Sequence, residues 1–260
     1  MKQNRRFDGK TAFVTGAGGG IGRETALAFA REGASVALVD LLEDGTAETL
    51  RLIEKDGGRG LAIPADISDA EAVARSFARA ILAFGKIDHA VNNAGISQPQ
   101  AATADIPLDV WARVMRVNVT GLWLCMREEL RHMADRGSGS IVNLASLAGL
   151  RTLPMSTAYV ASKHAVVGVT KNAAVEYAER GIRINAVAPG GVMTPMMDRE
   201  FIGMDDAQRA AAVAQISALH PMKRRGAATE IADAILFLSS DQASFITGAC
   251  LSVDGGWAAN

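Results

Sequence analysis

The sequence predicts an α/β protein with one doubly wound sheet of seven mainly parallel strands, flanked by helices on both faces. Short apolar runs alternate along the chain with longer segments of helical periodicity. The first four runs begin at residues 11, 35, 60 and 87, which leaves room for a helix and two loops between successive strands. Because seven strands in one sheet account for all 260 residues, we expect a single domain, residues 1–260.

The expected strands are continuous apolar runs, as is typical of strands that are buried on both faces of a parallel sheet. They are Thr11–Thr15, Ser35–Asp40, Gly60–Ala65, Ile87–Asn92, Ser140–Ala145, Arg183–Ala188 and Ala249–Asp254. The carboxyl ends of parallel strands meet at one edge of the sheet, and ligands of such sheets bind there. We therefore expect the functional residues to follow the strands.

Helical segments occupy the intervals between these runs. The segment after the first run has apolar residues at helical spacing and a stop signal at Gly33. Longer helices are expected from about Leu108 to Met133 and from about Met155 to Arg180, the second ending at Gly181. Residues 191–219 contain no strand, and we expect a loop with helical pieces over the edge of the sheet, acting as a lid.

Composition excludes several classes of function. With 27 basic and 28 acidic residues the net charge is −1, which gives no electrostatic case for nucleic acid or an anionic membrane as a partner. No apolar run is long enough to cross a membrane, and no secretion signal opens the chain. Cys125 and Cys250 are too few for a disulfide framework, so buried free thiols and a cytoplasmic location are expected. The four histidines are widely spaced, and no metal site is expected.

A glycine-rich turn follows the first expected strand. It has the pattern T-G-x-x-x-G-x-G, with Thr15, Gly16, Gly20 and Gly22 at the fixed positions. Between a strand and a helix, such a turn lets backbone N–H groups approach a pyrophosphate, and the helix N-terminus favours its negative charge. The sequence therefore predicts a Rossmann-type site for a dinucleotide.

An acidic residue ends the second expected strand. Asp40 is placed to accept hydrogen bonds from the adenosine ribose hydroxyls and to repel the 2′-phosphate of NADP. No basic residue is expected nearby to offset it, since position 19 is Gly and Leu41 and Leu42 follow the acid. The sequence predicts NAD as cofactor. Asp66, after the third strand, either hydrogen-bonds the adenine or caps the next helix.

Tyr159 and Lys163 lie one helical turn apart on one face of a long expected helix. An ammonium group beside a phenol favours the phenolate and makes tyrosine a usable acid or base near neutral pH. Ser146, at the end of the fifth strand, is placed to donate a hydrogen bond to a carbonyl oxygen at the same edge of the sheet.

At these residues the sequence resembles the short-chain dehydrogenase/reductase family, of the ordinary single-domain type, over essentially the whole chain. The matching pieces are the glycine-rich turn, Asp66, Asn92-Asn93-Ala94-Gly95, Asn118, Ser146, Tyr159 with Lys163, Pro189-Gly190 followed by Thr194, and Val253-Asp254-Gly255-Gly256.

The resemblance implies a role for each catalytic residue. Tyr159 is the general acid/base, and Lys163 lowers its pKa and holds the nicotinamide ribose. Ser146 orients the substrate oxygen, and Asn118 holds a water in a proton relay.

The same resemblance implies residues that line the two ligands. The expected cofactor residues are Gly16, Gly19, Gly20, Ile21, Gly22, Asp40, Leu41, Asp66, Ile67, Asn92, Ala94, Gly95, Tyr159, Lys163, Pro189, Gly190, Val192 and Thr194. The expected substrate residues are Ser97, Gln98, Ser146, Leu153, Tyr159, Met193 and Met197, a largely apolar set.

The function expected from these features is NAD-dependent oxidation of a secondary alcohol, or reduction of the ketone, and a bulky or cyclic apolar substrate is favoured. A 3-oxoacyl-carrier-protein reductase and a non-enzymatic cofactor-sensing regulator on the same fold remain alternatives. The resemblance also implies a homotetramer, with apolar surface supplied by Trp123, Leu124, Val166, Val167 and Val169 at one interface and by residues 245–257 at another.

Overall fold

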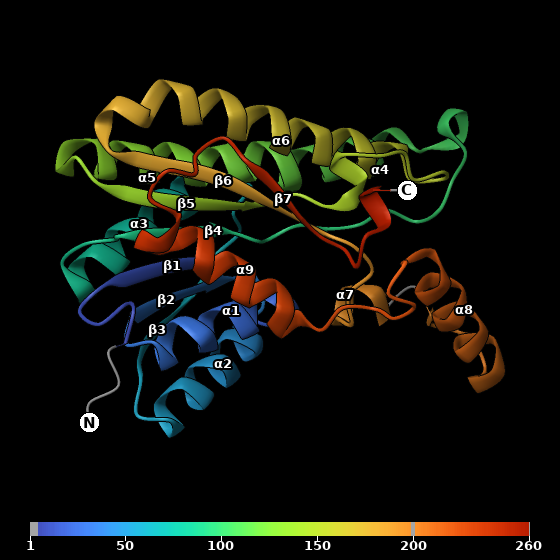
Figure 1. Cartoon of the computed structure of the whole chain (residues 1–260), viewed down its shortest axis with the longest axis horizontal. Helices are drawn as coiled ribbons and strands as arrows, with labels where there is room; N and C mark the ends of the chain where they lie inside the picture. The colour runs from blue at the N-terminus through green and yellow to red at the C-terminus, as the bar shows by residue number, and fades with distance from the viewer. Residues whose placement is uncertain (1–4, 199–200, 260) are drawn as a thin grey trace.

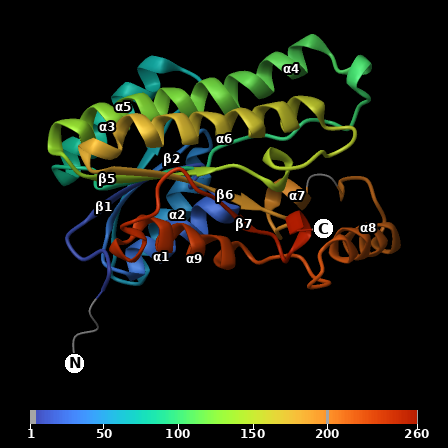
Figure 2. The ribbon, with the colours of Figure 1, turned by 45° about the horizontal axis from the view of Figure 1, so that its top comes forward.

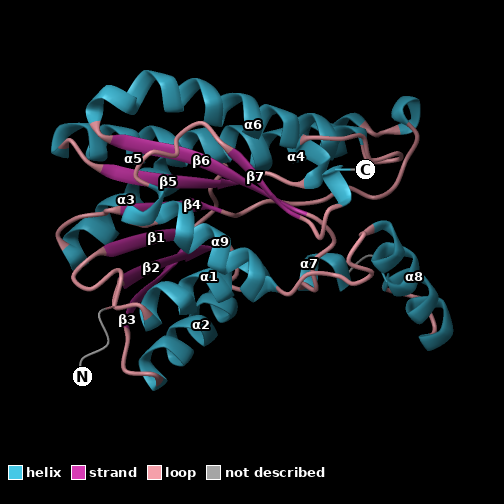
Figure 3. Cartoon of the chain, in the orientation of Figure 1, coloured by secondary structure: helices cyan, strands magenta, loops and turns pink. Residues whose placement is uncertain are grey.

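The computed structural model describes residues 5–198 and 201–259. In this part of the chain, seven parallel strands form one sheet in the order β3-β2-β1-β4-β5-β6-β7 (Figure 3). The strands are β1 (Thr11–Thr15), β2 (Ser35–Asp40), β3 (Arg59–Pro64), β4 (His89–Asn92), β5 (Gly139–Leu144), β6 (Ile182–Pro189) and β7 (Cys250–Val253). The predicted fold class is confirmed, and strand boundaries differ from the prediction by at most two residues.

Helices cover both faces of the sheet (Figures 1 and 2). One face carries α1 (Gly20–Arg31), α2 (Glu43–Lys55) and α9 (Ala228–Ser239). The other carries α3 (Ala70–Phe84), α4 (Leu108–Met115), α5 (Leu122–Arg136) and α6 (Thr157–Tyr177). Two further helices, α7 (Pro195–Asp198) and α8 (Asp206–Leu219), extend beyond the carboxyl ends of the strands. They lie within residues 191–219, which we call the lid segment because a lid is predicted there; that role stays a prediction. Arg199 and Glu200 lie outside the described residues.

The helix expected from Leu108 to Met133 is interrupted. A π-helical turn, Arg116–Gly121, separates α4 from α5. Such a turn inserts one residue into the helical ladder and is common at functional sites, because it re-aims a side chain. Here the buried Asn118 lies inside it. The other long helix, α6, begins at Thr157 and continues through a short 3-10 turn to Gly181, which adopts the left-handed conformation at φ 71°.

The apolar core lies on both faces of the sheet. Leu124, Val166 and Val167, which were expected on an interface, belong to the core of this chain and are at most 8% exposed. That expectation was wrong for these three residues, because their side chains pack within the core of this chain. Trp123 does remain half exposed, at 49%.

The direction of the chain connections reverses between β1 and β4. Thr15 and Asn92, the last residues of these two strands, are direct neighbours in the sheet. The chain leaves β1 toward α1 on one face and leaves β4 toward α4 on the other, so the two connections diverge. This is the place where sheets of this topology bind ligands.

Candidate active site

The glycine-rich turn packs tightly against the segment that follows β4. The Asn93 side chain donates to the carbonyl oxygens of Thr15 and Gly16, at 3.0 and 3.1 Å. A Cβ on Gly22 would collide with the carbonyl oxygen of Gly16, and Gly16 itself has a φ of 66°. Side chains are therefore excluded, and the backbone at the start of α1 stays open to an approaching phosphate.

Backbone groups hold Asp40 at the end of β2. Its Oδ2 accepts a hydrogen bond from Gly18 N at 2.9 Å, and its Oδ1 accepts one from Leu42 N at 3.0 Å. Each carboxylate oxygen keeps a free lone pair for a ribose hydroxyl. The glycine cradle and the anchored acid together fit a dinucleotide.

Arg23, on α1, bonds to the same glycine as Asp40. Its guanidinium donates to the carbonyl oxygens of Gly18 and Gly45 and to the Thr49 hydroxyl. Gly18 is thus a hydrogen-bond partner of both Arg23 and Asp40, and α1 brings this base from outside the sequence neighbourhood of Asp40. The guanidinium is engaged with neutral acceptors, and these leave few of its donors for a phosphate.

Asp66 does not cap α3. The N-cap is Asp69, whose carboxylate accepts from Glu71 N and Ala72 N. Asp66 accepts instead from Ser68 N at 2.8 Å, which fixes the turn after β3. The capping alternative is thereby corrected, and its adenine role stays a prediction.

Lys163, Asn118 and Gly95 lie close together just beyond the end of β4. Lys163 is buried, and its Nζ donates to Leu144 O, at the end of β5, over 2.7 Å. A Cβ on Gly95 would lie 3.2 Å from Asn118 Oδ1 and 3.6 Å from Lys163 Nζ. Burial lowers the pKa of Lys163 to about 8.

Asn118 is fixed on three sides. Its Oδ1 accepts from Ile96 N at 2.8 Å, and its Nδ2 donates to Ile96 O at 2.9 Å and to Ser162 Oγ at 3.0 Å. The Ser162 hydroxyl in turn donates to Tyr159 O. Ser162 therefore ties the π-helical turn to the α6 backbone at Tyr159.

Tyr159 lies at the start of α6, where two further groups position it. The Lys163 Nζ lies 5.6 Å from the centre of the Tyr159 ring. The buried Gln98 accepts from Tyr159 N at 3.0 Å, and its Nε2 faces the carbonyl oxygens of Pro99 and Met155. The Gln98 amide is thus engaged with the backbone; its predicted contact with substrate stays a prediction.

Ser146 reaches the same edge of the sheet, two residues beyond β5. Its Oγ accepts from Ala148 N at 3.1 Å and so starts the 3-10 turn Leu147–Gly149. A Cβ on Gly149 would approach Lys163 O to 2.7 Å, so this turn packs directly against α6 beside the Tyr159–Lys163 segment.

The lid begins over the glycine-rich turn. A Cβ on Gly20 would lie 3.4 Å from the Thr194 side chain and 3.5 Å from Pro195. Large apolar side chains are exposed on the lid and on the loop before α6: Met193 at 52%, Met155 at 46% and Leu153 at 39%. Met155 O accepts from Ala101 N, so this loop also joins the segment after Gly95.

Comparison with known proteins identifies the family of this chain. A family model described as enoyl-(acyl carrier protein) reductase matches residues 16–258. The chain is 42% identical to a 2,5-dichloro-2,5-cyclohexadiene-1,4-diol dehydrogenase of Sphingobium indicum, over 97% of this chain and 98% of that protein. It belongs to the short-chain dehydrogenase/reductase family.

Two further members of the family extend the comparison. A cis-4-hydroxycyclohexanecarboxylate dehydrogenase of Sinomonas cyclohexanicum is 41% identical, over 97% of this chain and 98% of that protein. The crystal structure of a carveol dehydrogenase from Mycobacterium avium in complex with NAD has a TM-score of 0.92 and 31% identity, covering 98% of this chain and 99% of that one.

The family resemblance did not indicate three residues that shape the site. They are Arg23, described above, Arg151 and His220. His220 Nε2 accepts from Gly191 N at 3.0 Å, and its ring packs against Trp257 at 4.9 Å between centroids. Arg151 donates to Trp257 O at 2.6 Å. The C-terminal tail thus packs against His220, at the end of α8 in the lid segment of the same chain.

Among the described residues, no cluster of His, Cys, Asp or Glu has the arrangement of a metal site. Cys125 is buried and Cys250 is half-buried, and both thiols are free. The described helices include none that is long and apolar enough to cross a membrane.

Proposed function

We propose that this protein is an NAD(H)-dependent oxidoreductase that interconverts a secondary alcohol and a ketone. The observation that carries the proposal is the cluster of Lys163 with Asn118 beside Gly95 and with the Tyr159 ring. Asp40, at the end of β2, is anchored to the glycine-rich turn through Gly18 N. Relatives with printed dehydrogenase names support the reaction class.

The chain's own residues supply the proton chemistry. Tyr159 exchanges a proton with the substrate oxygen, and the Ser146 hydroxyl holds that oxygen in place. With a pKa of about 8, Lys163 is mostly cationic at neutral pH, and its charge near the Tyr159 ring favours the phenolate. Asn118 is fixed to Ile96 and Ser162, which suits a residue that orients a water between Lys163 and solvent.

A nicotinamide coenzyme, when bound, accepts or supplies the hydride. The backbone from Gly16 to Gly22 would hold its diphosphate, Thr194 would close over it, and Asp40 would accept from its ribose. Asp40 favours NAD over NADP because a 2′-phosphate beside a carboxylate is repelled. The guanidinium of Arg23 is engaged with Gly18, Gly45 and Thr49, which supports this preference.

An apolar and cyclic secondary alcohol is the substrate class that we favour. Leu153, Met155 and Met193 present apolar surface around the site. A free sugar would bury several hydroxyls there, and an unpaired hydroxyl costs about 1–3 kcal/mol. Two relatives have ring alcohols in their names. Unbranched methionine side chains repack easily, so we expect several related ketones to be accepted.

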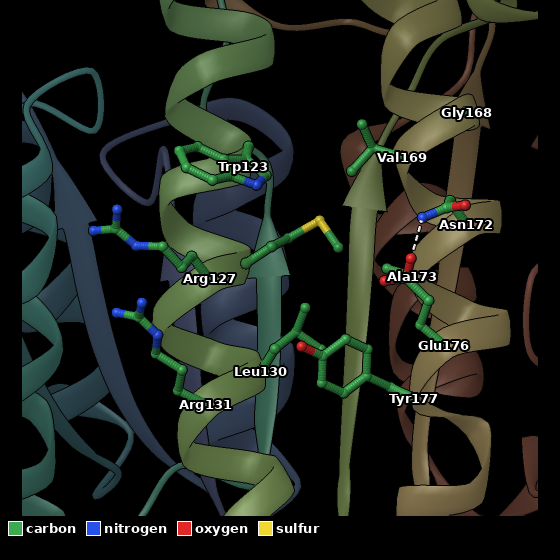
Figure 4. A pocket seen from close by; sticks show the side chains of 11 residues that line it. Trp123, Arg127, Leu130, Arg131, Gly168, Val169, Asn172, Ala173, Glu176 and Tyr177 are labelled. Carbon is green, nitrogen blue, oxygen red and sulfur yellow. Dashed lines mark hydrogen bonds between the residues drawn. The ribbon is translucent and has the colours of Figure 1, made fainter.

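We also propose that the active form is a homotetramer. A groove of about 660 Å³ lies between α5 and α6, with Trp123, Leu130 and Val169 among its walls (Figure 4). Phe245, in the segment expected at a second interface, is fully exposed. Apolar surfaces of this kind suit two-fold contacts between identical chains. The cytoplasmic location stays a prediction.

The test is a substrate screen followed by absorbance of the reduced nicotinamide, run with NAD(H) and with NADP(H). We expect turnover of cyclic secondary alcohols and ketones with NAD(H), and little turnover of glucose. In Tyr159→Phe we expect the turnover of the cyclic alcohols and ketones to be nearly lost. Preference for a 3-oxoacyl thioester on a carrier protein would establish the alternative reductase activity. Coenzyme binding without turnover of any alcohol or ketone would contradict the proposal and favour the cofactor-sensing regulator.

A further inference from the structure

A buried carboxyl group lies between α5 and the sheet, outside the catalytic set. Glu129 has no solvent exposure. Its Oε2 accepts a hydrogen bond from Asn92 Nδ2 at 3.0 Å. The same Asn92 nitrogen donates to Asn143 Oδ1 at 3.0 Å, and Asn143 Nδ2 donates to Thr170 Oγ1 at 2.9 Å. One chain of hydrogen bonds therefore joins α5, β4, β5 and α6.

This network contains two buried acceptors that lack a donor in the described part of the chain. They are Glu129 Oε1 and Asn92 Oδ1, which belong to the two groups already joined by the bond between Asn92 Nδ2 and Glu129 Oε2. Leaving a buried acceptor unpaired is costly, and leaving a buried carboxylate charge unpaired costs more. A single proton on Glu129 Oε1 removes both problems, because a carboxylic acid and a carboxamide can pair through two parallel hydrogen bonds.

We propose that Glu129 is a neutral carboxylic acid at neutral pH and a positioning residue, whose O–H donates to Asn92 Oδ1 and thereby fixes the carboxyl ends of β4 and β5. This role in catalysis rests on the proposed function; the protonation state does not.

The network stands directly behind the site. Asn92 precedes Asn93, whose side chain ties the segment after β4 to the glycine-rich turn. Asn143 precedes Leu144, whose carbonyl oxygen accepts from Lys163 Nζ. A shift of either strand end therefore moves the cofactor cradle relative to Lys163. Misplacement of reacting groups by about 1 Å can cost a hundredfold in rate.

Among the residues that the structure describes, no basic side chain pairs with Glu129 to keep it ionised. On its own helix, the titratable neighbours are the buried Cys125 and Glu128, and Glu128 faces Arg127 and Arg131 instead. The sheet presents Asn92 and Asn143, α6 presents Thr170, and the core side of α3 presents the apolar Phe77 and Ala80. Burial raises the pKa of Glu129 to about 8, and only the Asn92 hydrogen bond opposes the rise.

The sign of the pH dependence follows from this shift. A glutamate in an unfolded chain titrates near its ordinary pKa of 4.5, whereas the folded chain keeps its proton up to a pKa of about 8. The folded state thus binds more protons between these values. The contribution of the protonated Glu129 to the stability of the folded state is complete below pH 4.5, falls as pH rises and is lost above pH 8. The folding equilibrium constant should fall by up to about tenfold per pH unit in this range.

The experiment compares the full-length wild type with Glu129→Gln, Glu129→Leu and the control Glu128→Gln. Glutamine reproduces both hydrogen bonds of the neutral acid and cannot ionise. Infrared spectra at neutral pH should show a carboxylic-acid C=O band in the wild type and in Glu128→Gln, and should lose it in Glu129→Gln. This readout does not depend on catalysis, so it stands even if the proposed activity fails.

Stability and kinetics test the positioning role. The folding equilibrium constant of the wild type divided by that of Glu129→Gln should fall as pH rises from 5 to 8. Lys163 titrates in the same range, but its contribution is common to both proteins and cancels in this ratio. Glu129→Gln should keep the neutral-pH kcat and extend activity to higher pH, whereas Glu129→Leu should lose about tenfold or more in kcat. The absence of the acid band, a constant stability ratio, or a Gln variant as impaired as Leu would each overturn the proposal.

Discussion

Site side chains are held by the backbone before any ligand arrives. Asp40 is anchored by two N–H groups, Asn118 by Ile96, and the Lys163 ammonium by Leu144 O. A side chain that is already ordered loses little conformational entropy on binding, so its hydrogen bonds contribute more fully to affinity and orientation. The predicted site residues are therefore largely ordered by the fold itself.

The first residue-scale prediction concerns coenzyme choice. Asp40→Ala removes the carboxylate that repels a 2′-phosphate and accepts from the ribose, so kcat/KM should fall with NADH and rise with NADPH. We expect the ratio of kcat/KM with NADH to kcat/KM with NADPH to fall by at least about tenfold, which corresponds to about 1.4 kcal/mol. Steady-state kinetics with both coenzymes measure it, with the nearby exposed Glu43→Ala as control. A wild type that prefers NADPH would contradict the assignment.

A second prediction separates the roles of Tyr159 and Lys163. Tyr159→Phe keeps the ring and removes the proton donor, so kcat should fall by about 10²–10⁴-fold while NADH affinity stays near wild type. Lys163→Ala should lower both kcat and the affinity for NADH, because the ammonium lies near the Tyr159 ring and near Gly95, where the cofactor is expected. Steady-state rates and NADH fluorescence titration provide the two readouts. Tyr177→Phe, at the other tyrosine of the chain, is the control; a fully active Tyr159→Phe would refute the mechanism.

At the scale of elements, local patterns predicted most of the architecture. Strand positions were readable because buried parallel strands are continuous apolar runs. The π-helical turn at Asn118 and the neutral pairing of Glu129 with Asn92 were not readable, since both depend on contacts between residues distant in the sequence. Arg23 was missed for the same reason, because its acceptors come from the glycine-rich turn and α2.

His220 links the lid to the loop after β6, which leads to the third prediction. Since Gly191 N–H donates to Nε2, the ring proton lies on Nδ1 and donates to Ile216 O. His220→Ala leaves the buried Gly191 N–H unpaired, a loss of about 1–3 kcal/mol in the free energy of unfolding. A looser lid should raise KM for substrate and coenzyme more than it lowers kcat. His164→Ala, on the exposed side of α6, is the control, and unchanged KM values would exclude this coupling.

In the described part of the molecule, a largely apolar groove of about 660 Å³ lies between α5 and α6. Its walls are Trp123, Met126, Arg127, Leu130, Arg131, Gly168, Val169, Asn172, Ala173, Glu176 and Tyr177 (Figure 4). Arg127 and Arg131 share the single carboxylate of Glu128, and Glu176 accepts from Asn172, so both signs of charge border the apolar centre. An apolar centre with a charged rim is typical of protein interfaces. A two-fold axis can place this surface against its own copy.

Gly168 offers a clean test of assembly. A Cβ at this position meets nothing within 4 Å, so Gly168→Arg fits the single chain, and an exposed helical glycine replaced by another residue gains up to about 1 kcal/mol of helix propensity. A second copy seated in the groove would meet the new side chain. We expect light scattering at micromolar concentration to give four chains for the wild type and two for Gly168→Arg, the remaining pair being held through the segment that contains Phe245.

The matched control, Val175→Arg, adds the same charge to an exposed position of α6 outside the groove and should stay tetrameric. A monomeric wild type would exclude the assembly, and a Gly168→Arg variant that remains tetrameric would place the interface elsewhere.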